Sequence, residues 1–577
     1  MMARIVNNND LILDNMTTPE EDVVIERFTV IDNSTYINPD AGGYNGVFKR
    51  YNRQTRRLAR PFLGELRAVC AANKIPLVVK DERPPWKYKI APQEAITPDY
   101  LAGITLDDYQ IESIKVGCRV EVCIFDIPTG GGKTEVMAGL CKAIKCPTVI
   151  LADQRIVIDQ IKQRLELREI VDEVGLFYAG QTPDNQLVIA GSVQSLNIPS
   201  RVPAPPQESD AYSKAKILVA KDPEKFGLEA NDDTAAFEKA VNKLADKIHI
   251  GNNKKHASAL KGFRKRKKRA KQFQAIVKKC EMIIVDECDL AGNNTQYKSV
   301  FRHYFTGRRR YGFSGTPFDP EKPVDGLFVQ EHLGSVMMKV ERRELEAKGR
   351  IVPIEYIMFA LGNTPMERSA FDIAVRERMV ENVEFHTIIK LICQQYKDEK
   401  SLVLVERDPL GKALEAAIPG SVFIHGKTPK RRRNEVLRAF EKGEIRVVIG
   451  GKILRRGLDL KGGCENLILA TGGKLWSTIN QQIGRAVRIN KRGFGRVIDF
   501  LLLYNKYLYK HSRARLRAVV GMGYKTKVVF PDGNKVEGGN FLVTGYRKAK
   551  PRTQIGQSIG PGRHRLGREA AQPDDSF

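Results

Sequence analysis

The sequence predicts an α/β protein with two doubly wound domains in tandem, preceded by a small α+β domain. Short apolar runs alternate with helical periods from about residue 101 to 320, and a second series of this kind begins near residue 400. A chain of 577 residues is also too long for a single hydrophobic core. We predict domains at 1–95, 96–330, 331–520 and 521–577, the last being a C-terminal extension whose end, from about 551, has a disordered composition.

The apolar runs give the expected strands. In the first large domain they lie at 122–127, 148–151, 186–190, 282–285 and 311–314. In the second they lie at 401–405, 422–424, 446–449, 467–470 and 496–500. Continuous apolar runs of this length are typical of parallel strands that are buried on both faces.

A glycine-rich loop follows the first of these runs. Residues 128–134 read Pro-Thr-Gly-Gly-Gly-Lys-Thr and precede a segment compatible with a helix. Glycines let successive backbone N–H groups point at phosphate oxygens, and the helix adds its positive N-terminal end. We therefore expect an ATP site with Lys133 at the β- and γ-phosphates, Thr134 at Mg²⁺, and a loop formed by Thr129, Gly130, Gly131 and Gly132. Because Ile127 stands where the usual pattern has Gly or Ala, a glycine turn without nucleotide is the alternative.

Two adjacent carboxylates emerge at the end of the run 282–285. Asp286 is predicted to hold Mg²⁺, and Glu287 to polarise the water that attacks the γ-phosphate. This division of roles needs neighbouring side chains at one strand end. The alternative is a solvated acidic turn, which is less common directly after apolar residues.

The charge of the chain points to a polyanionic partner. The net charge is +27, the pI is about 9.6 and 42% of the residues are hydrophobic, as in a folded basic protein. Nucleic acid fits this charge better than a membrane does, because the sequence has no apolar run of about 18 residues and no signal-peptide pattern. Nine scattered cysteines without a Cys-x-x-Cys pair predict neither a zinc site nor a disulfide framework. We expect a soluble cytoplasmic protein, in the host cytoplasm if its source is viral.

Two basic segments are candidates for nucleic-acid contact. A polar insertion from about 198 to 275 ends in the run 261–271, in which eight of eleven residues are basic. Its candidate phosphate contacts are Arg264, Lys265, Arg266, Lys267, Lys268 and Arg269, with a solvated helix face or a localisation-type run as the alternative. In the N-terminal domain, basic residues interleave with Phe48 and Tyr51, a pattern that suits phosphate binding and base stacking. The candidates there are Lys49, Arg50, Arg53, Arg56 and Arg57, and the alternative is a solvated helix with core aromatics.

Further segments occur in a fixed order along the chain. Residues 106–110 read Leu-Asp-Asp-Tyr-Gln, 191–195 Gly-Ser-Val-Gln-Ser, 313–317 Phe-Ser-Gly-Thr-Pro, 457–459 Gly-Leu-Asp, and 481–488 Gln-Gln-Ile-Gly-Arg-Ala-Val-Arg. With the glycine loop and the acid pair, this ordered set resembles the motifs of superfamily 2 helicases and translocases over about residues 100–500. The resemblance implies two RecA-like domains.

The resemblance also implies roles for individual residues. Gln110 would recognise the adenine, while Ser314 and Thr316 would couple hydrolysis to nucleic-acid contacts that include Gln194. From the second domain, Gln481, Arg485 and Arg488 would approach the γ-phosphate, and one of the two arginines would stabilise transition-state charge. Gly457 and Asp459 would link the nucleotide cleft to the nucleic-acid groove.

The details of the motifs favour one branch of the superfamily. Leu-x-x-Tyr-Gln at 106–110 and Gln-x-x-Gly-Arg-x-x-Arg at 481–488 look like the XPB, RecG and type I/III restriction-translocase side, which acts mainly on DNA. Ser314-Gly-Thr316 differs from the Ser-Ala-Thr of DEAD-box ATPases, which act on RNA. The N-terminal segments 36–39, 44–46 and 61–66 resemble the small first domain of UvsW-type bacteriophage helicases, which remodel branched DNA, D-loops and R-loops in recombination, repair and replication.

This resemblance implies an ATP- and Mg²⁺-dependent DNA helicase or translocase, with DNA and replication or recombination proteins as partners and no membrane contact. The alternatives are a duplex translocase that does not separate strands, a nucleotide-gated annealing protein and an RNA-dependent ATPase. No oligomeric state is predicted.

Overall fold

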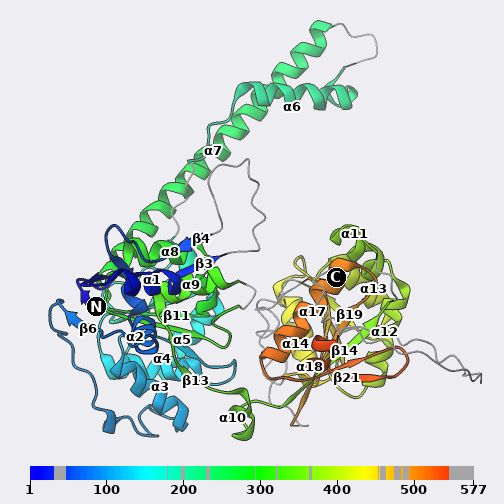
Figure 1. Ribbon diagram of the computed structural model, residues 1–577. Helices are drawn as coiled ribbons and strands as arrows, with labels where there is room; N and C mark the ends of the chain where they lie inside the picture. Colours follow the sequence, from blue (N-terminus) through cyan, green and yellow to red (C-terminus); the bar gives the residue numbers. More distant parts are fainter. Residues whose placement is uncertain are drawn as a thin grey trace, which may run out of the picture.

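The protein has two large α/β domains, a small N-terminal domain and a long helical arm (Figure 1). The computed structural model describes residues 1–31, 47–178, 180–196, 202–228, 234–292, 294–319, 322–362, 367–451, 454, 463–473, 483–484 and 493–544. None of the helices in these ranges is both long and apolar enough to cross a membrane.

The first large domain is built on a seven-stranded parallel sheet in the order β13-β7-β12-β11-β8-β10-β9. Buried apolar residues cover both faces of this sheet, as its unbroken hydrophobic runs predict. Its strands are β7 (Val122–Asp126), β8 (Thr148–Ala152), β9 (Gly175–Phe177), β10 (Val188–Ser192), β11 (Met282–Asp286), β12 (Arg309–Ser314) and β13 (Val336–Lys339). The helices include α3 (Asp108–Arg119), α4 (Lys133–Ile144), α5 (Arg155–Leu167), α8 (Thr295–Ser299) and α9 (Pro323–Leu333).

The second large domain has an eight-stranded sheet in the order β16-β17-β15-β18-β19-β14-β20-β21, which is parallel except for the last pair. The strands are β14 (Ile354–Leu361), β15 (Ser401–Val405), β16 (Val422–Ile424), β17 (Val447–Gly450), β18 (Asn466–Ala470), β19 (Gly495–Leu502), β20 (Lys525–Val529) and β21 (Lys535–Glu537). The helices include α11 (Phe371–Val375), α12 (Val383–Gln395), α13 (Asp408–Ala417), α14 (Lys430–Lys442), α17 (Lys506–Gly521) and α18 (Gly538–Thr544). Two tandem doubly wound domains are thereby confirmed.

Both sheets extend beyond the domain limits expected from the sequence. The edge strand β13 pairs with β7, although we placed the end of the first domain at residue 330. The strands β20 and β21 continue the second sheet beyond residue 520, where we expected an extension. The central strand β14 was missed as well. Short strands at the edge of a sheet, such as β13 and β21, give a weak sequence signal, because half of their surface faces solvent. This reason does not apply to β14, whose eight residues are mostly apolar and buried. The tail from 551, expected to be disordered, lies outside the described residues.

The small N-terminal domain packs on the first large domain. Its four-stranded mixed sheet consists of β1 (Met2–Ile5), β2 (Asp10–Asp14), β5 (Arg57–Ala59) and β6 (Val78–Asp81), accompanied by α1 (Thr18–Arg27), α2 (Leu63–Ala72) and the hairpin β3 (Thr29–Ile31) and β4 (Val47–Lys49). The small α+β domain is thereby confirmed.

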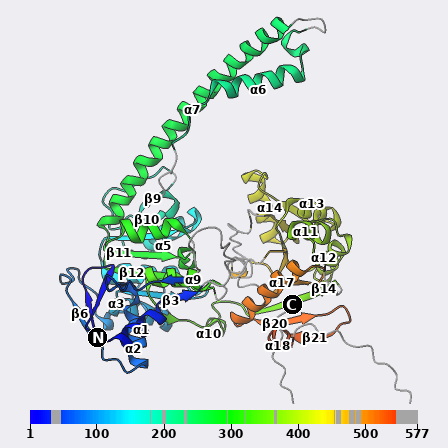
Figure 2. The same cartoon turned by 45° about the horizontal axis from the view of Figure 1, so that its top comes forward.

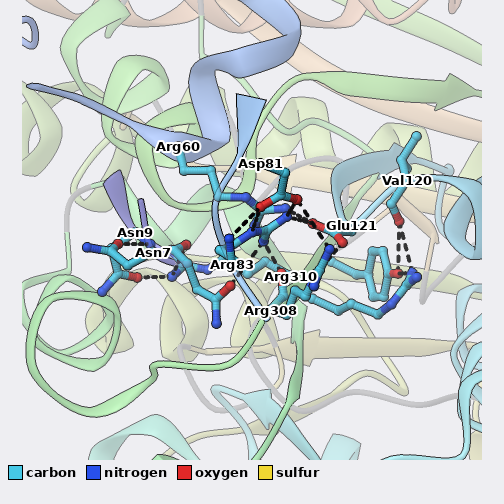
Figure 3. Close-up of polar contacts among 12 residues, drawn as sticks. Asn7, Asn9, Arg60, Asp81, Arg83, Val120, Glu121, Arg308 and Arg310 are labelled. Atoms are coloured by element: carbon cyan, nitrogen blue, oxygen red, sulfur yellow. Dashed lines mark hydrogen bonds and ion pairs between the residues drawn. The ribbon is translucent and has the colours of Figure 1, made fainter. Parts of the chain in front are cut away.

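A cluster of charged residues joins this domain to the first sheet (Figure 3). Arg60 and Arg83 from the N-terminal domain and Arg308 beside β12 all pair with Glu121, which precedes β7. The Arg83–Glu121 distance is 2.9 Å, and the side chain of Arg60 is only 6% exposed. Burial lowers the pKa of Arg60 to about 10 despite the neighbouring Glu121. These ion pairs fix the N-terminal domain on the first large domain.

The insertion in the first domain forms an arm of two helices, α6 (Glu208–Lys221) and α7 (Thr234–Lys279). Both views show this arm projecting far from the body of the protein (Figures 1 and 2). At its base, Phe273 of α7 stacks on Phe177 of β9 with ring centroids 4.1 Å apart. Towards the tip, α6 packs on α7 through a small apolar cluster that includes Val219, Val241 and Ala245.

Candidate nucleotide cleft

The predicted nucleotide-binding residues meet at the carboxyl edge of the first sheet. The glycine loop follows β7, the acid pair ends β11, and Ser314 ends β12, which lies between those two strands. In parallel sheets this edge is the usual binding side for ligands. Lys133 and Glu287 are thus neighbours although they are 154 positions apart in the chain.

The glycine loop has a backbone that side chains would obstruct. Gly130 has φ 90° and Gly132 has φ 73°, both in the left-handed region that glycine adopts without strain. A Cβ on Gly131 would lie 2.7 Å from Ile127 Cγ2. Gly132 is the N-cap of α4, so the helix begins directly at the loop. This arrangement presents the N–H groups of the helix start to an anion.

Lys133 makes an ion pair with the proposed catalytic carboxylate. Its Nζ donates to Glu287 Oε1 at 3.1 Å, and the lysine side chain is 12% exposed. Burial alone would lower the pKa of Lys133, but Glu287 and Asp286 outweigh it, so the pKa is raised and the ammonium stays charged. A cation that is buried among carboxylates suits the binding of a phosphate group.

The acid pair has a backbone outlier at its second residue. Glu287 has φ 50°, a conformation that costs about 1–3 kcal/mol for most residues and persists where the surroundings impose it. Asp286 is 8% exposed. Next to the pair, burial and the charge of Glu287 raise the pKa of Asp289 to about 7, and Ser314 Oγ donates to Asp289 Oδ1 at 2.9 Å. Thr316 N in turn donates to Ser314 Oγ at 3.1 Å, so β12 is linked to the acidic strand end.

Gln110 lies beside the glycine loop. Its Oε1 accepts from Asp107 N at 2.9 Å, and its Nε2 lies 3.4 Å from Gly131 O. Asp107 and Gln110 form a capping box at the start of α3, and Tyr109 Oη donates to Gly131 O at 3.0 Å. The first turn of α3 therefore supports the loop from one side.

The segment that joins the two large domains packs on the same loop. It contains α10 (Arg342–Ala347) and continues to Ile351. Arg350 makes a bidentate pair with Asp107, with Nε–Oδ2 at 2.8 Å and Nη2–Oδ1 at 3.0 Å. A Cβ on Gly130 would lie 2.7 Å from Ile351 Cγ2, so the linker touches the loop directly. Neither Arg350 nor Asp107 was predicted as a site residue, although Asp-x-x-Gln at 107–110 is the pattern of a capping box.

The second large domain reaches the loop at Gly484. A Cβ on Gly484 would lie 2.6 Å from Thr129 Cγ2. A cavity of about 520 Å³ lies between the two large domains, and the residues lining it include Thr316, Lys339 and Arg517. The predicted residues Gly457, Asp459, Gln481, Arg485 and Arg488 lie outside the described residues.

A second ion pair that the sequence analysis missed stabilises the helix after the loop. Glu135 of α4 and Arg168 after α5 are each 7% exposed, with Arg168 Nε and Glu135 Oε2 at 2.9 Å. Arg168 also donates to the carbonyl oxygens of Ala102 and Gly103, at 2.9 and 3.1 Å. No local signal marked these two residues, because their partners come from distant segments.

The basic residues of the N-terminal domain divide into two groups. Lys49, Arg53, Arg56 and Arg57 are exposed. Arg50 was predicted to contact nucleic acid and is instead turned into the protein, where its guanidinium lies 3.8 Å from the Phe328 ring centroid and its Nη1 lies 3.3 Å from Glu331. Its side chain is 11% exposed, because it packs this domain onto α9.

The basic run of the insertion lies on α7. Arg264 to Lys268 are exposed. Arg269 is partly buried, with its Nη2 donating to Gln181 O at 2.8 Å and its guanidinium 5.3 Å from the Phe177 ring centroid, and its contact with nucleic acid stays a prediction. Gln194 is exposed at the end of β10 and donates to Asp153 after β8.

The donor set at the cleft fits Mg²⁺ rather than a metal held by many side chains. Within the described residues, no group of three or more His, Cys, Asp or Glu side chains is arranged to hold a metal ion. Thr134 and Asp286 offer hard oxygen donors. Mg²⁺ is usually held by one or two such groups together with waters and substrate phosphates.

Two family models match the chain in order. The type III restriction enzyme res subunit model matches residues 103–319, and the helicase conserved C-terminal domain model matches residues 384–490. The first match spans the glycine loop and the acid pair, and the second spans the segment 481–488.

Curated relatives are helicases of two kinds. ATP-dependent RNA helicase glh-1 of Caenorhabditis elegans is 24% identical over 292 residues, which are 48% of this chain and 35% of that protein. ATP-dependent DNA helicase RecG of Acidithiobacillus ferridurans is 26% identical over 164 residues, which are 27% of this chain and 23% of that protein. The matched part thus spans about a third or less of the length of these relatives.

Solved structures that align with this chain include UvsW and Dbp5, both with TM-scores below 0.5. UvsW of bacteriophage T4 has a TM-score of 0.38 and 13% identity, covering 92% of this chain and 99% of that one. Dbp5 of S. cerevisiae, bound to RNA and ADP BeF3, has a TM-score of 0.39 and 13% identity, covering 76% and 96%. The two family models, matching in order on the two large domains, show that the chain belongs to the superfamily 2 helicases.

Proposed function

We propose that the protein is an ATP- and Mg²⁺-dependent DNA helicase or translocase that unwinds or remodels branched DNA. One observation supports this proposal. The acid pair of β11 and Gly484 of the second domain both contact the glycine loop or the Lys133 that follows it. A pocket assembled from both large domains can couple nucleotide state to their relative position.

In the proposed reaction, ATP binds with its phosphates along the glycine loop. Lys133 exchanges its contact with Glu287 for the β- and γ-phosphates, which frees the Glu287 carboxylate. Glu287 then orients and polarises the attacking water, and Gln110 holds the adenine. Bound Mg²⁺, held by Thr134 and Asp286, would neutralise phosphate charge.

Closure of the cleft would complete the site. Gly484, packed on Thr129, directly precedes Arg485, and Arg488 follows three residues after Arg485 in the sequence. We propose that Gln481, Arg485 and Arg488 reach the γ-phosphate from the second domain and that one arginine stabilises the transition state. Closure of the cleft would then change the contacts with the bound nucleic acid. The residues that link the two sites would be Gly457 and Asp459 in the second domain and Ser314 and Thr316 in the first.

The chemistry of the surface and the motif details favour DNA as substrate. A net charge of +27 suits a phosphate backbone, and the exposed residues Lys49, Arg53, Arg56 and Arg57 offer contacts beside the first domain. Leu-x-x-Tyr-Gln at 106–110 resembles the DNA-directed branch of the superfamily, and Ser314-Gly-Thr316 differs from the Ser-Ala-Thr of DEAD-box ATPases. The match to an RNA helicase makes an RNA-dependent ATPase the second candidate.

The substrate class is tested by ATPase rates with single-stranded, duplex, forked and four-way DNA and with RNA. We expect the largest stimulation with forked or four-way DNA, together with strand displacement on a fork. Stimulation by RNA alone would overturn the DNA assignment, and stimulation without displacement would identify a translocase.

The catalytic role is tested by Glu287→Gln. We expect this variant to bind ATP with an affinity close to that of the wild type and to lose turnover by at least about a hundredfold, because the amide cannot accept a proton from water. ATP binding is measured by equilibrium titration and turnover by phosphate release. Wild-type turnover in this variant would contradict the role of Glu287.

A further inference from the structure

The long helix α7 carries a row of lysines on one side. Its 46 residues contain twelve lysines and three arginines but only two acids, Glu238 and Asp246. Lys247, Lys254, Lys261 and Lys268 recur every seven residues, and all are exposed. At 100° per residue, this spacing returns to nearly the same side of the helix and drifts by only about 20° each time.

The row covers almost the whole helix. Lys243, Lys265 and Lys279 fall within about 60° of the four lysines that recur every seven residues. From Lys243 to Lys279 the helix rises about 54 Å, at 1.5 Å per residue. We call the seven exposed lysines at 243, 247, 254, 261, 265, 268 and 279 the lysine row.

The fully buried residues of α7 lie away from the lysine row. Its buried residues are Val241 and Ala245 under α6, and Phe263, Ala270, Phe273, Gln274 and Val277 towards the base. On average these positions lie about 165° from the lysine row around the helix axis, with Phe273 nearest to it at about 110°. The lysines of the row therefore stay exposed along the helix, although partly buried Ala240 and Ile276 pack beside the row near its two ends. The helix belongs to an arm that projects from the body of the protein in both views (Figures 1 and 2).

The chemistry of this face fits the backbone of a double helix. A straight row of cations about 54 Å long matches about 16 base pairs of duplex at 3.4 Å per pair. No aromatic residue lies in the row, whereas proteins that grip single strands usually stack bases on aromatic rings. Lysine binds phosphate as a point charge and reads no base, so the contacts would be independent of sequence.

We propose that the lysine row of α7 is a docking surface for duplex DNA, outside the nucleotide cleft. This inference rests on the proposed DNA substrate and extends the predicted basic run in both directions. The arm would hold the double-stranded part of a branched substrate while the two large domains act on the junction. It also separates Lys265 and Lys268, which lie in the row, from Arg269, whose guanidinium contacts Gln181 and Phe177.

The test compares two sets of four substitutions in the full chain. The row variant is K243Q/K247Q/K254Q/K261Q. The control variant K214Q/K216Q/K221Q/K225Q removes the same charge from exposed lysines of the same arm that lie on and just after α6. Glutamine is a good helix former, so both variants should keep the helix content measured by circular dichroism.

The measurement is the affinity for a 20-base-pair DNA duplex over a range of salt concentrations. Each lost phosphate contact lowers the slope of log K against log salt by about 0.9, so we expect the row variant to lose two to about four units and the control variant less than one. Basal ATPase without DNA should be unchanged in both. Equal losses of slope in the two variants would overturn the docking surface.

Two further outcomes separate this inference from the proposed function. A wild-type protein that neither binds DNA nor shows DNA-stimulated ATPase would overturn the function itself. A wild-type protein that is stimulated by DNA, paired with a row variant that binds duplex like the control, would overturn only the role of the arm. A greater loss with a single strand or an RNA duplex than with duplex DNA would overturn the assigned ligand.

Discussion

Arg350 on the interdomain linker is predicted to set the affinity for ATP from outside the cleft. Its bidentate pair with Asp107 holds the first turn of α3, and this turn presents Tyr109 and Gln110 to the glycine loop. The substitution Arg350→Ala removes the pair and leaves the loop sequence intact. We expect Gln110 to be less well placed for the adenine, which weakens ATP binding.

The expected change in ATP affinity follows from how exposed the Arg350–Asp107 ion pair is. The Arg350 side chain is 47% exposed and that of Asp107 is 16% exposed, so the pair belongs to the range of about 0.2–1 kcal/mol found for ion pairs at the surface. The bidentate geometry favours the upper end of that range. Since about 1.4 kcal/mol is a factor of ten, the KM for ATP should rise by no more than about fivefold. The kcat at saturating ATP should hardly change, because the lost interaction is equal in ground and transition states.

The assay is steady-state ATPase at saturating DNA, with three further variants. Asp107→Asn keeps a good N-cap but loses the charge, so it should match Arg350→Ala. Arg350→Lys should lie between that variant and the wild type, because an ammonium cannot make the bidentate contact. The double variant R350A/D107N should be no worse than either single variant.

Two results would refute this reasoning. One is a double variant whose effect equals the sum of the single effects, since independent residues add. The other is a loss in kcat as large as the change in KM.

Two other predictions concern the surroundings of the loop. Arg168→Met leaves buried Glu135 paired with Arg164, 3.0 Å away. The unfolding free energy of the first domain, measured by urea denaturation, should fall by up to about 3 kcal/mol, less than for a buried charge left unpaired; a change below about 1 kcal/mol would contradict a role in stability. Gly484→Ala places a methyl group 2.6 Å from Thr129 Cγ2 and should lower ATPase at least tenfold with unchanged duplex DNA affinity, whereas wild-type ATPase would show that the two domains do not meet there during turnover.

Local patterns determined the fold class and the chemistry of the first domain's site. The glycine loop and the acid pair were recognisable because strand, loop and helix follow one another within about 20 residues, and because buried parallel strands are continuous apolar runs. Short edge strands such as β13 and β21 lack that signal. Arg50 was misassigned because an arginine run has the same sequence whether its side chains face solvent or a neighbouring domain.

The sequence by itself determined which residues could bind phosphate, hold a metal ion and activate water, because these roles depend on residue type and short spacing. Only the tertiary structure decided which distant residues support them, as with Arg350 on Asp107, Arg168 on Glu135, and Gly484 on Thr129. It also decided that the lysines of α7 share one uncovered face, since the side of a helix that packs depends on its neighbours. The physical reason is that such contacts join segments far apart in the chain, and their geometry exists only once the sheets and domains have packed.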